Sequence, residues 1–412
     1  MAFLPMDIIL SCILPKLPAK SLIRFRCVCK SFLAEISSPK FVKLHHHNAL
    51  YSDSNRLLIF KNDSQGIYVY NLNSPHSPPS LIRFPKITLY SHQISIVATC
   101  ECYLLIGYED NYHDSLFLLN PSTRMYRELP RIPCNSQVVL YGMCHRLDEF
   151  NDEYKVVRFV DFEGIDGCEL EVMVYNTTTN LWKLIESKTV VDTFISCYDN
   201  NPVLVQNHLL HLLFFDFDHG LGLDHIKRIG CFDMKAERWA NDVQLPDILW
   251  DENGLDLSLG RPYNLGALDD QLCFMGHYVN GSNFDFWVMK EYGVKESWVK
   301  LMSFCVSNDL DSERLYDESY HPLAYRTGSP YELLYMHDRC NCKFYWYNLR
   351  DKEAIEAEFA RIFDYEFWSD FLGYICKGSI LDFPGGQLIK VSLEEDDDDE
   401  EENENDDENF IS

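Results

Sequence analysis

The feature that most constrains the fold is a short pattern that recurs along the chain with a nearly constant period. An apolar run ends in Asn or Asp, a short polar turn follows, and an aromatic residue stands six positions after the Asn or Asp. It is plainest in the segments "FLLNPSTRMY", "MVYNTTTNLW" and "GCFDMKAERW". We call the residue at the Asn or Asp position the mark of each copy. With the weaker copies included, the marks are Asn71, Asn120, Asn176, Asp233, Lys290 and Asn348, and their spacings are 49, 56, 57, 57 and 58 residues.

This period is the length of one four-stranded β-propeller blade, and Kelch-type repeats are about 50 residues long. The Asn or Asp suits a hairpin because its side chain caps turns locally. The aromatic residue is expected to pack between neighbouring blades. Six marks therefore predict an all-β, propeller-like domain of about six blades. Two irregular β-sandwiches would also give strands, but not six marks at one period.

The N-terminal stretch "LPMDIILSCILPKLPAKSLIRFRCVCKSF" predicts a small all-α unit. Pro5 and Pro18 stand where the first turn of a helix tolerates proline. One apolar face has steps of three and four residues and comprises Leu22, Phe25, Cys29, Phe32 and Ile36. Apolar residues on a second face must pack elsewhere, because a unit of about 40 residues is marginal alone. That second face indicates either an interface with a partner or docking on the large domain.

Charge is distributed unevenly along the chain. The net charge is -28, and residues 394–408 hold 13 acidic side chains in 15 positions. The first 45 residues carry seven Lys or Arg against two acids, which leaves about -20 for residues 46–393. The large domain lacks the basic surface that phosphate binding needs, so nucleic acid is not expected as a partner. A basic partner suits the large domain, and composition predicts a disordered acidic tail.

Apolar runs and cysteine spacing indicate the cellular compartment of the protein. The opening stretch lacks the basic region and unbroken apolar run of a signal peptide, and no run reaches the 18 or so apolar residues of a membrane helix. The 15 cysteines include C-x-C pairs and no C-x-x-C metal or redox spacing. We therefore expect reduced thiols, a cytoplasmic or nuclear location, and no membrane partner.

No catalytic, cofactor or metal site is predicted. The motifs of serine hydrolases, zinc proteases and P-loop proteins do not occur. The segments "HGLGLDH" and "DFDHG" are interpreted as a polar hairpin because the third glycine of a dinucleotide loop and the later ligands of a calcium loop are missing. His45, His46 and His47 are consecutive, and we expect a solvated linker there in place of a metal site.

Taken together, these segments resemble plant F-box proteins with a C-terminal F-box-associated domain. The N-terminal stretch resembles the F-box, and six later segments follow the order of that domain's signature. They are "LLNPSTRMYRELP", "YKVVRF", "VMVYNTTTNLWKLI", "CFDMKAERW", "LGALDDQLCF" and "FWVMKEYGVKESWVKL". The resemblance covers about residues 3–385. It implies an F-box at 1–45, a propeller-like target-binding domain at 46–392 and an acidic tail at 393–412.

The resemblance also implies a function. The F-box would bind the Skp adaptor, and through it the cullin of an SCF ubiquitin ligase, while the propeller holds a protein target for degradation. The phrase "WVMKEYGVKESW" is similar to the S-locus F-box group, which implies a basic target such as an S-RNase. Carried over by position, the adaptor-facing residues are Leu4, Pro5, Ile8, Ile9, Leu14, Leu17, Pro18, Leu22, Phe25, Cys27, Val28, Cys29, Lys30 and Phe32.

Two positions depart from the family pattern. The last F-box aromatic is usually Trp and is Phe32 here, and Tyr103 stands in a turn where the family has C-x-G-L. The second departure leaves the geometry of the first or second blade open. Two alternative functions also remain at this point: a glycan-binding propeller lectin with an incidental F-box, and a propeller enzyme whose catalytic residues converge from distant segments.

Overall fold

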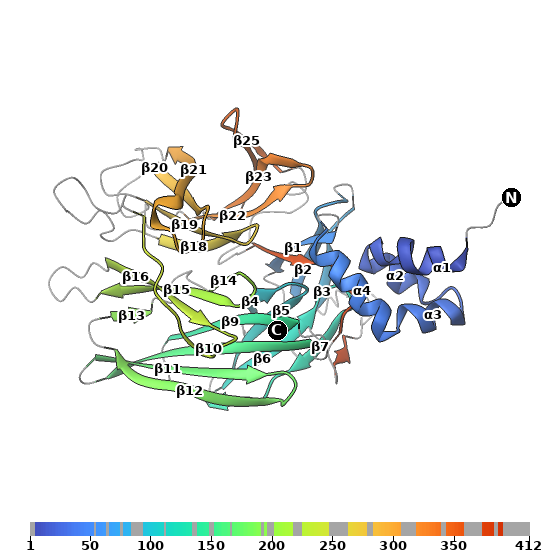
Figure 1. Cartoon of the computed structure of the whole chain (residues 1–412), viewed down its shortest axis with the longest axis horizontal. Helices are drawn as coiled ribbons and strands as arrows, with labels where there is room; N and C mark the ends of the chain where they lie inside the picture. Colours follow the sequence, from blue (N-terminus) through green and yellow to red (C-terminus); the bar gives the residue numbers. More distant parts are fainter. Residues whose placement is uncertain are drawn as a thin grey trace, which may run out of the picture.

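The computed structural model shows a group of short N-terminal helices beside a six-bladed β-propeller, which confirms the predicted fold class (Figure 1). The structure describes residues 5–389 except 53–54, 63–65, 75–76, 84–93, 111–112, 134–137, 148–151, 165–166, 191–192, 196–201, 217–224, 247–262, 278–282, 306–318, 339–342, 358–372 and 383–385. Leu4, the acidic tail and most of the "HGLGLDH" segment therefore lie outside the described residues.

The helical unit consists of short helices around one small core. They are α1 (Met6–Ile8), the π-helical turn η1 (Ile9–Ile13), the 3-10 turn η2 (Leu14–Lys16), α2 (Ala19–Phe25), α3 (Lys30–Ile36) and α4 (Pro39–Leu50). Local chemistry starts the last two. The Cys29 side chain accepts the backbone N–H of Phe32, and the Ser38 hydroxyl accepts that of Phe41, so each caps a helix N-terminus.

Each blade is an antiparallel sheet of four to six strands. Blade 1 contains β26 (Gly373–Lys377), β1 (Arg56–Asn62), β2 (Gly66–Asn71) and β3 (Ser80–Arg83). Blade 2 contains β4 (Ile94–Cys100), β5 (Tyr103–Asp110), β6 (His113–Asn120), β7 (Met125–Glu128), β8 (Ile132–Pro133) and β27 (Gln387–Leu388). Blade 3 contains β9 (Val138–Leu147), β10 (Asp152–Gly164), β11 (Gly167–Asn176) and β12 (Leu181–Val190).

The second half of the ring follows the same plan. Blade 4 contains β13 (Thr193–Ile195), β14 (Val203–Val205), β15 (Leu209–Asp216), β16 (His225–Asp233) and β17 (Arg238–Trp239). Blade 5 contains β18 (Tyr263–Leu268), β19 (Gln271–His277), β20 (Asn283–Met289) and β21 (Trp298–Cys305), with the 3-10 turn η5 (Lys295–Ser297) before β21. Blade 6 contains β22 (Ser319–Arg326), β23 (Ser329–Asp338), β24 (Lys343–Asn348) and β25 (Glu353–Glu356).

The ring is closed by strands from opposite ends of the chain. One strand of each blade touches its neighbour in the order β26, β4, β9, β14, β18, β22 and back to β26. Strand β26 comes from the C-terminal end and pairs with β1, so blade 1 is assembled from both ends of the chain. Strand β27 then adds to β7 at the outer side of blade 2. Because the ring is closed, each blade has a neighbouring blade on both sides, and both faces of its sheet are covered.

Five of the six marks of the sequence repeat are the last residue of the third main strand of their blade, and Lys290 directly follows that strand in blade 5. Asn120 illustrates the chemistry, because its Oδ1 accepts the backbone N–H of Ser122 and Thr123 and so holds the turn into β7. The corresponding oxygens of Asn176, Asp233 and Asn348 accept two backbone N–H groups each. Blade 5 has Lys290 at this position, and there the Ser297 hydroxyl accepts the N–H of Glu291 instead.

The aromatic residues of the repeat pack between blades, as predicted. Trp182 of blade 3 packs against a cluster that includes Tyr103 and Leu105 of blade 2. Its indole N–H donates to the Pro130 carbonyl at 2.9 Å. The other members, Tyr126, Trp239 and Trp298, also lie in or against clusters shared by two consecutive blades. Each blade thus covers an apolar face that its neighbour cannot bury alone.

The turn that departs from the family pattern is a two-residue hairpin. Cys100 pairs with Tyr103, and Glu101 between them has a φ of 53°. This left-handed conformation is uncommon for residues other than glycine. The Tyr103 side chain is buried, and its hydroxyl donates to the Leu381 carbonyl at 3.0 Å. The tyrosine therefore fills the core between blade 2 and the C-terminal segment, and residues 100–103 form a regular two-residue hairpin turn.

The expectation of a solvated linker at His45, His46 and His47 is wrong. All three lie in α4, where His45 and His46 are buried and only His47 is exposed. The reason is that α4 is covered on two sides, by the other helices and by the propeller. Consecutive side chains on a helix point about 100° apart, so His45 contacts the helical unit at Leu17 and His46 contacts the propeller at Glu101. The expected boundary after residue 45 falls inside this helix. Within the described residues, no helix has both the length and the apolar character needed to span a bilayer.

Candidate functional site

The core of the helical unit contains a residue from the far end of the chain. Its buried members are Leu14, Ala19, Leu22, Ile36, Phe41 and Ile380. The last of these follows β26 and reaches back from the propeller. Val42 of α4 packs both against this core and against the core between blades 2 and 3. The helical unit and the propeller therefore share continuous apolar packing.

The structure separates the residues expected to face the adaptor into three groups. Leu14 and Leu22 are 3% and 0% exposed and belong to the core just described, so their own chain already covers them. The partly buried members pack against that core or border it, and they are Ile9, Leu17, Pro18, Phe25 and Phe32. The exposed members are Pro5, Ile8, Cys27, Val28, Cys29 and Lys30.

We call five of the exposed apolar side chains on the helical unit the adaptor surface, after the sequence-based expectation that this unit faces an adaptor. It comprises Met6, Ile8, Ile13, Val28 and Leu33, which are 41–65% exposed. Two of the five, Ile8 and Val28, are among the residues that the sequence predicts to face the adaptor. Periodicity alone could not separate the exposed apolar residues from the buried ones. The first helix changes from α to π to 3-10 geometry within 11 residues, so the number of residues per turn is not constant along it. Phe32 keeps the packing role expected of it, with its ring centroid 6.4 Å from that of Phe25.

A polar cluster lies where α4 meets the propeller. We call His46, Glu101, His145 and Ser379 the junction cluster. His46 Nε2 is 3.0 Å from Glu101 Oε2, and His46 Nδ1 is 3.1 Å from the Ser379 hydroxyl. His145 Nδ1 is 2.5 Å from the same Glu101 oxygen. The His46, Glu101 and His145 side chains are 3%, 10% and 0% exposed.

Electrostatics keep Glu101 in its charged form. Burial raises the pKa of this carboxyl, but its contacts with His145 and His46 outweigh burial and bring the pKa to about 2. The His145 ring is also fixed by stacking on Tyr154, with centroids 4.1 Å apart. The cluster therefore places one buried carboxylate between two imidazoles at the contact of the helical unit with blades 2 and 3.

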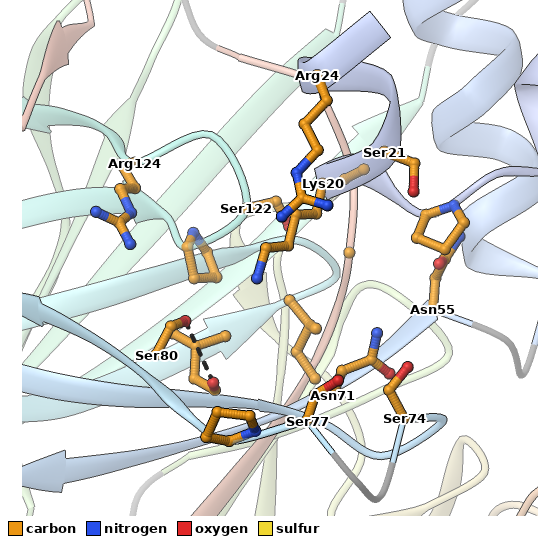
Figure 2. A pocket seen from close by; sticks show the side chains of 17 residues that line it. Lys20, Ser21, Arg24, Asn55, Asn71, Ser74, Ser77, Ser80, Ser122 and Arg124 are labelled. Atoms are coloured by element: carbon orange, nitrogen blue, oxygen red, sulfur yellow. Dashed lines mark hydrogen bonds between the residues drawn. The ribbon is translucent and has the colours of Figure 1, made fainter.

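A pocket of about 280 Å³ lies between α2 and blades 1 and 2 (Figure 2). Lys20 and Arg24 line it from the helix, and Arg124 lines it from the turn before β7. In the described part of the chain none of the three forms an ion pair. Among the described residues the lining holds no acidic side chain and five serines, which are Ser21, Ser74, Ser77, Ser80 and Ser122. Cations and hydroxyls at one place suit an anionic group.

A second groove, of about 540 Å³, lies between blades 6 and 1 and has the opposite character. Its acidic lining is Glu332, Asp351, Glu353 and Glu356, and its two cations are Arg56 and Arg326. Both cations have partners: Arg56 donates to the Thr327 hydroxyl at 2.8 Å, and Arg326 lies 3.2 Å from Glu332. Trp346 also lines the groove, with the Arg326 guanidinium over its ring at 5.1 Å from the centroid. The groove suits a basic, partly apolar segment of a partner.

The comparisons with known proteins can now be set against this geometry. Residues 4–44 match the F-box domain, and residues 57–326 match the F-box associated beta propeller domain. The two matches correspond to the helices and to blades 1–6 as far as β22.

The chain belongs to the F-box proteins with an F-box-associated β-propeller domain.

Relatives of the F-box family span most of its length. F-box protein CPR1 of Arabidopsis thaliana is 31% identical over 379 residues, which cover 86% of this chain and 84% of that protein. The F-box/kelch-repeat protein At3g23880 of the same plant is 25% identical, over 71% of this chain and 77% of the relative. A six-bladed fungal lectin from Aleuria aurantia is 10% identical with a TM-score of 0.35, over 71% of this chain and 89% of that chain. That likeness is too low to support a shared ligand.

Sequence reasoning missed the groove, the pocket and the junction cluster for one common reason. Each joins residues from segments that are far apart in the sequence, and the ring closure that brings them together depends on β26. Two signals for the junction cluster were present in the sequence: the run of three histidines at 45–47 and the departure from the family pattern at residues 100–103.

Proposed function

We propose that this F-box protein is the substrate-recognition subunit of an SCF-type ubiquitin ligase. The observation that carries the proposal is the presence in one chain of an F-box domain and an F-box-associated propeller. The F-box binds the Skp adaptor and through it the cullin, and the propeller binds a protein target. The chain acts in the cytoplasm or nucleus and performs no bond chemistry itself. It raises the effective concentration of a target lysine near ubiquitin carried by another subunit.

The adaptor-binding part is the helical unit, residues 1–45 in the division that the family resemblance implies. Five exposed apolar side chains in so short a segment give a partner the anchors that dominate such interfaces. Lys16 and Lys30 of the same unit are also exposed, and their positive charge complements an acidic partner. Leu14 and Leu22 support these anchors from beneath, without contacting the adaptor.

The target-binding part is the propeller, residues 46–392, followed by the acidic tail at 393–412. We propose a basic protein target, of which the S-RNase implied by the S-locus resemblance is one example. Two observations support a basic target: the charge of about -20 over residues 46–393, and the acidic lining of the groove between blades 6 and 1. Opposite charges of this kind steer association and suppress wrong partners.

Co-purification of the full chain with the Skp adaptor tests the central claim. We expect the double variant Ile8→Asp/Val28→Asp to lose adaptor binding at least about 100-fold, because two charges would be buried at the interface. These side chains are 44% and 65% exposed, so the variant is expected to fold. A substitution at Leu22 would not be informative, because it would disrupt the core.

The matched control is Tyr51→Asp, which changes a side chain that is 79% exposed at the end of α4. It is expected to bind the adaptor like the unaltered chain. Equal adaptor binding by the double variant and the control would refute the assignment of the surface, and failure of the unaltered chain to bind the adaptor would refute the proposed function.

A further inference from the structure

We propose that His46, Glu101 and His145 bind one Zn²⁺ ion where α4 meets blades 2 and 3. The three side chains each offer one ligand atom, and these atoms all lie within 4.8 Å of one another. They come from three separate elements: the middle of α4, the hairpin between β4 and β5, and the end of β9. Only the folded chain brings them together, as expected for a metal that stabilises a fold.

The separations fit a small tetrahedral site. Zinc binds histidine nitrogen and carboxylate oxygen at about 2.0–2.2 Å, so neighbouring ligand atoms around one ion stand roughly 3.3 Å apart. The Glu101 oxygen lies 3.0 Å from His46 Nε2 and 2.5 Å from His145 Nδ1. Side-chain shifts of less than about 1 Å would make room for the ion. Two imidazoles and one carboxylate form a donor set that zinc uses in proteins.

The surroundings supply what a zinc site needs around its ligands. The Ser379 hydroxyl, which is buried, lies 3.1 Å from His46 Nδ1 and can accept its N–H, which leaves Nε2 free to bind metal. Tyr154 stacks on His145 and fixes the ring. A water molecule can complete the coordination, because the Glu101 side chain keeps 10% exposure.

The zinc would join three separate elements of the fold. The ion would connect the F-box helix α4 to blade 2 through Glu101 and to blade 3 through His145. Through Ser379 it would also hold the segment that follows β26. It would therefore hold the adaptor surface at one orientation relative to the propeller, and the zinc content would not depend on which target the propeller binds.

Metal analysis of the full chain tests the proposal directly. The chain is purified without a histidine tag, and its zinc is measured by mass spectrometry. We expect about one zinc per chain, and replacement by Co²⁺ is expected to give the visible absorption of a four-coordinate ion. Chelation is expected to lower Tm, and added Zn²⁺ to restore it. A chain that is purified with less than about a tenth of an equivalent and takes up neither Zn²⁺ nor Co²⁺ overturns the proposal, and the cluster is then a hydrogen-bonded triad.

Two conservative variants and one matched control sharpen the result. Glu101→Gln keeps the shape but removes the charged ligand, and Ser379→Ala removes only the partner of His46. We expect zinc affinity to fall at least about tenfold in each, since even the loss of an outer partner has this effect. His47→Ala alters the exposed neighbour on α4 and is expected to bind zinc like the unaltered chain. Equal affinity in Glu101→Gln and the unaltered chain would also overturn the proposal.

Discussion

Leu22 and Ile380 come from opposite ends of the chain and are buried in the same hydrophobic cluster, 0% and 1% exposed. The contact ties the F-box to the strand that closes the propeller, since Ile380 follows β26 by three residues. Two hydrogen bonds reinforce the connection on either side: the backbone N–H of Gly378 donates to the Asn55 carbonyl, and the side-chain Nδ2 of Asn120 donates to the Leu381 carbonyl, each at 2.6 Å.

We predict that Ile380→Ala lowers the free energy of unfolding by about 2–5 kcal/mol, because it leaves a cavity in a core with few members. Adaptor binding should weaken as well, since the same core supports the adaptor surface. Chemical denaturation and adaptor titration measure the two effects. Leu388→Ala is the matched control, being 60% exposed in the same C-terminal segment, and is expected to change neither quantity. A variant at position 380 that unfolds like the control would show that the helical unit is independent of the segment.

The repeat predicts that tryptophans at equivalent positions contribute equally to the stability of the propeller. Trp182 donates its indole N–H to the Pro130 carbonyl at 2.9 Å, and Trp298 donates to the Gln244 carbonyl at 3.0 Å. We expect Trp182→Phe and Trp298→Phe each to cost about 1 kcal/mol of stability, since most ring packing is kept and one hydrogen bond is lost. Equilibrium unfolding of both variants gives the measurement. Leu184→Ala, at a side chain 53% exposed on the same strand as Trp182, serves as control.

Acid stability should depend on His211, which is buried between blades 4 and 5. Its Nε2 lies 2.8 Å from the Tyr292 hydroxyl, which also contacts Cys231, and its Nδ1 lies 3.2 Å from the Val203 carbonyl. Burial lowers the pKa of His211 from 6.5 to about 4, so the folded state binds this proton less readily than the unfolded state. The contribution of neutral His211 to the free energy of unfolding is therefore complete above pH 6.5. It decreases as the pH falls toward 4, by up to about 3 kcal/mol.

The variant His211→Gln is expected to flatten the fall in stability between pH 6.5 and pH 4, although it lowers stability at pH 7. Unfolding free energies measured at several pH values give the slope. His208→Gln, at a partly exposed histidine three residues away, should leave the slope unchanged. An unaltered slope in His211→Gln would mean that other groups cause the acid sensitivity.

Target binding should weaken as salt concentration rises, because screening acts on the acidic propeller and a basic target; the Debye length is about 10 Å at 0.1 M salt. The triple variant Asp351→Lys/Glu353→Lys/Glu356→Lys reverses most of the acidic lining of the groove between blades 6 and 1. We expect it to bind the target more weakly and with a smaller salt dependence. Affinity measured for both chains over a range of salt concentrations checks this, and salt-independent binding by the unaltered chain would contradict a basic target.

Much of the fold could be predicted because its determinants are local. Asn120 and its counterparts cap the turn next to them, and Trp182 follows its mark at a fixed distance, so each blade repeats a pattern visible in about ten residues. Local chemistry also starts the F-box helices at Cys29 and Ser38. These features need no knowledge of what the rest of the chain does.

The parts that could not be predicted depend on contacts between distant segments. Nothing near β26 indicates that it pairs with β1, and nothing near His46 indicates that α4 is covered on both sides. Leu22 shows the limit most clearly. Its apolar face was correctly recognised, but a periodic pattern cannot tell a face covered by a partner from one covered by the chain's own C-terminal segment.

The C-terminal segment has a consequence for synthesis on the ribosome. The F-box is translated before the propeller, but Ile380 becomes available to its core only after blades 2–6 have been made. A chain that stops before residue 373 would lack both the closing strand and this core residue. Such a fragment should be a poor ligand for the adaptor, so early stop codons are expected to behave as simple losses of function and not as dominant inhibitors. Ligase assembly would then favour finished receptors.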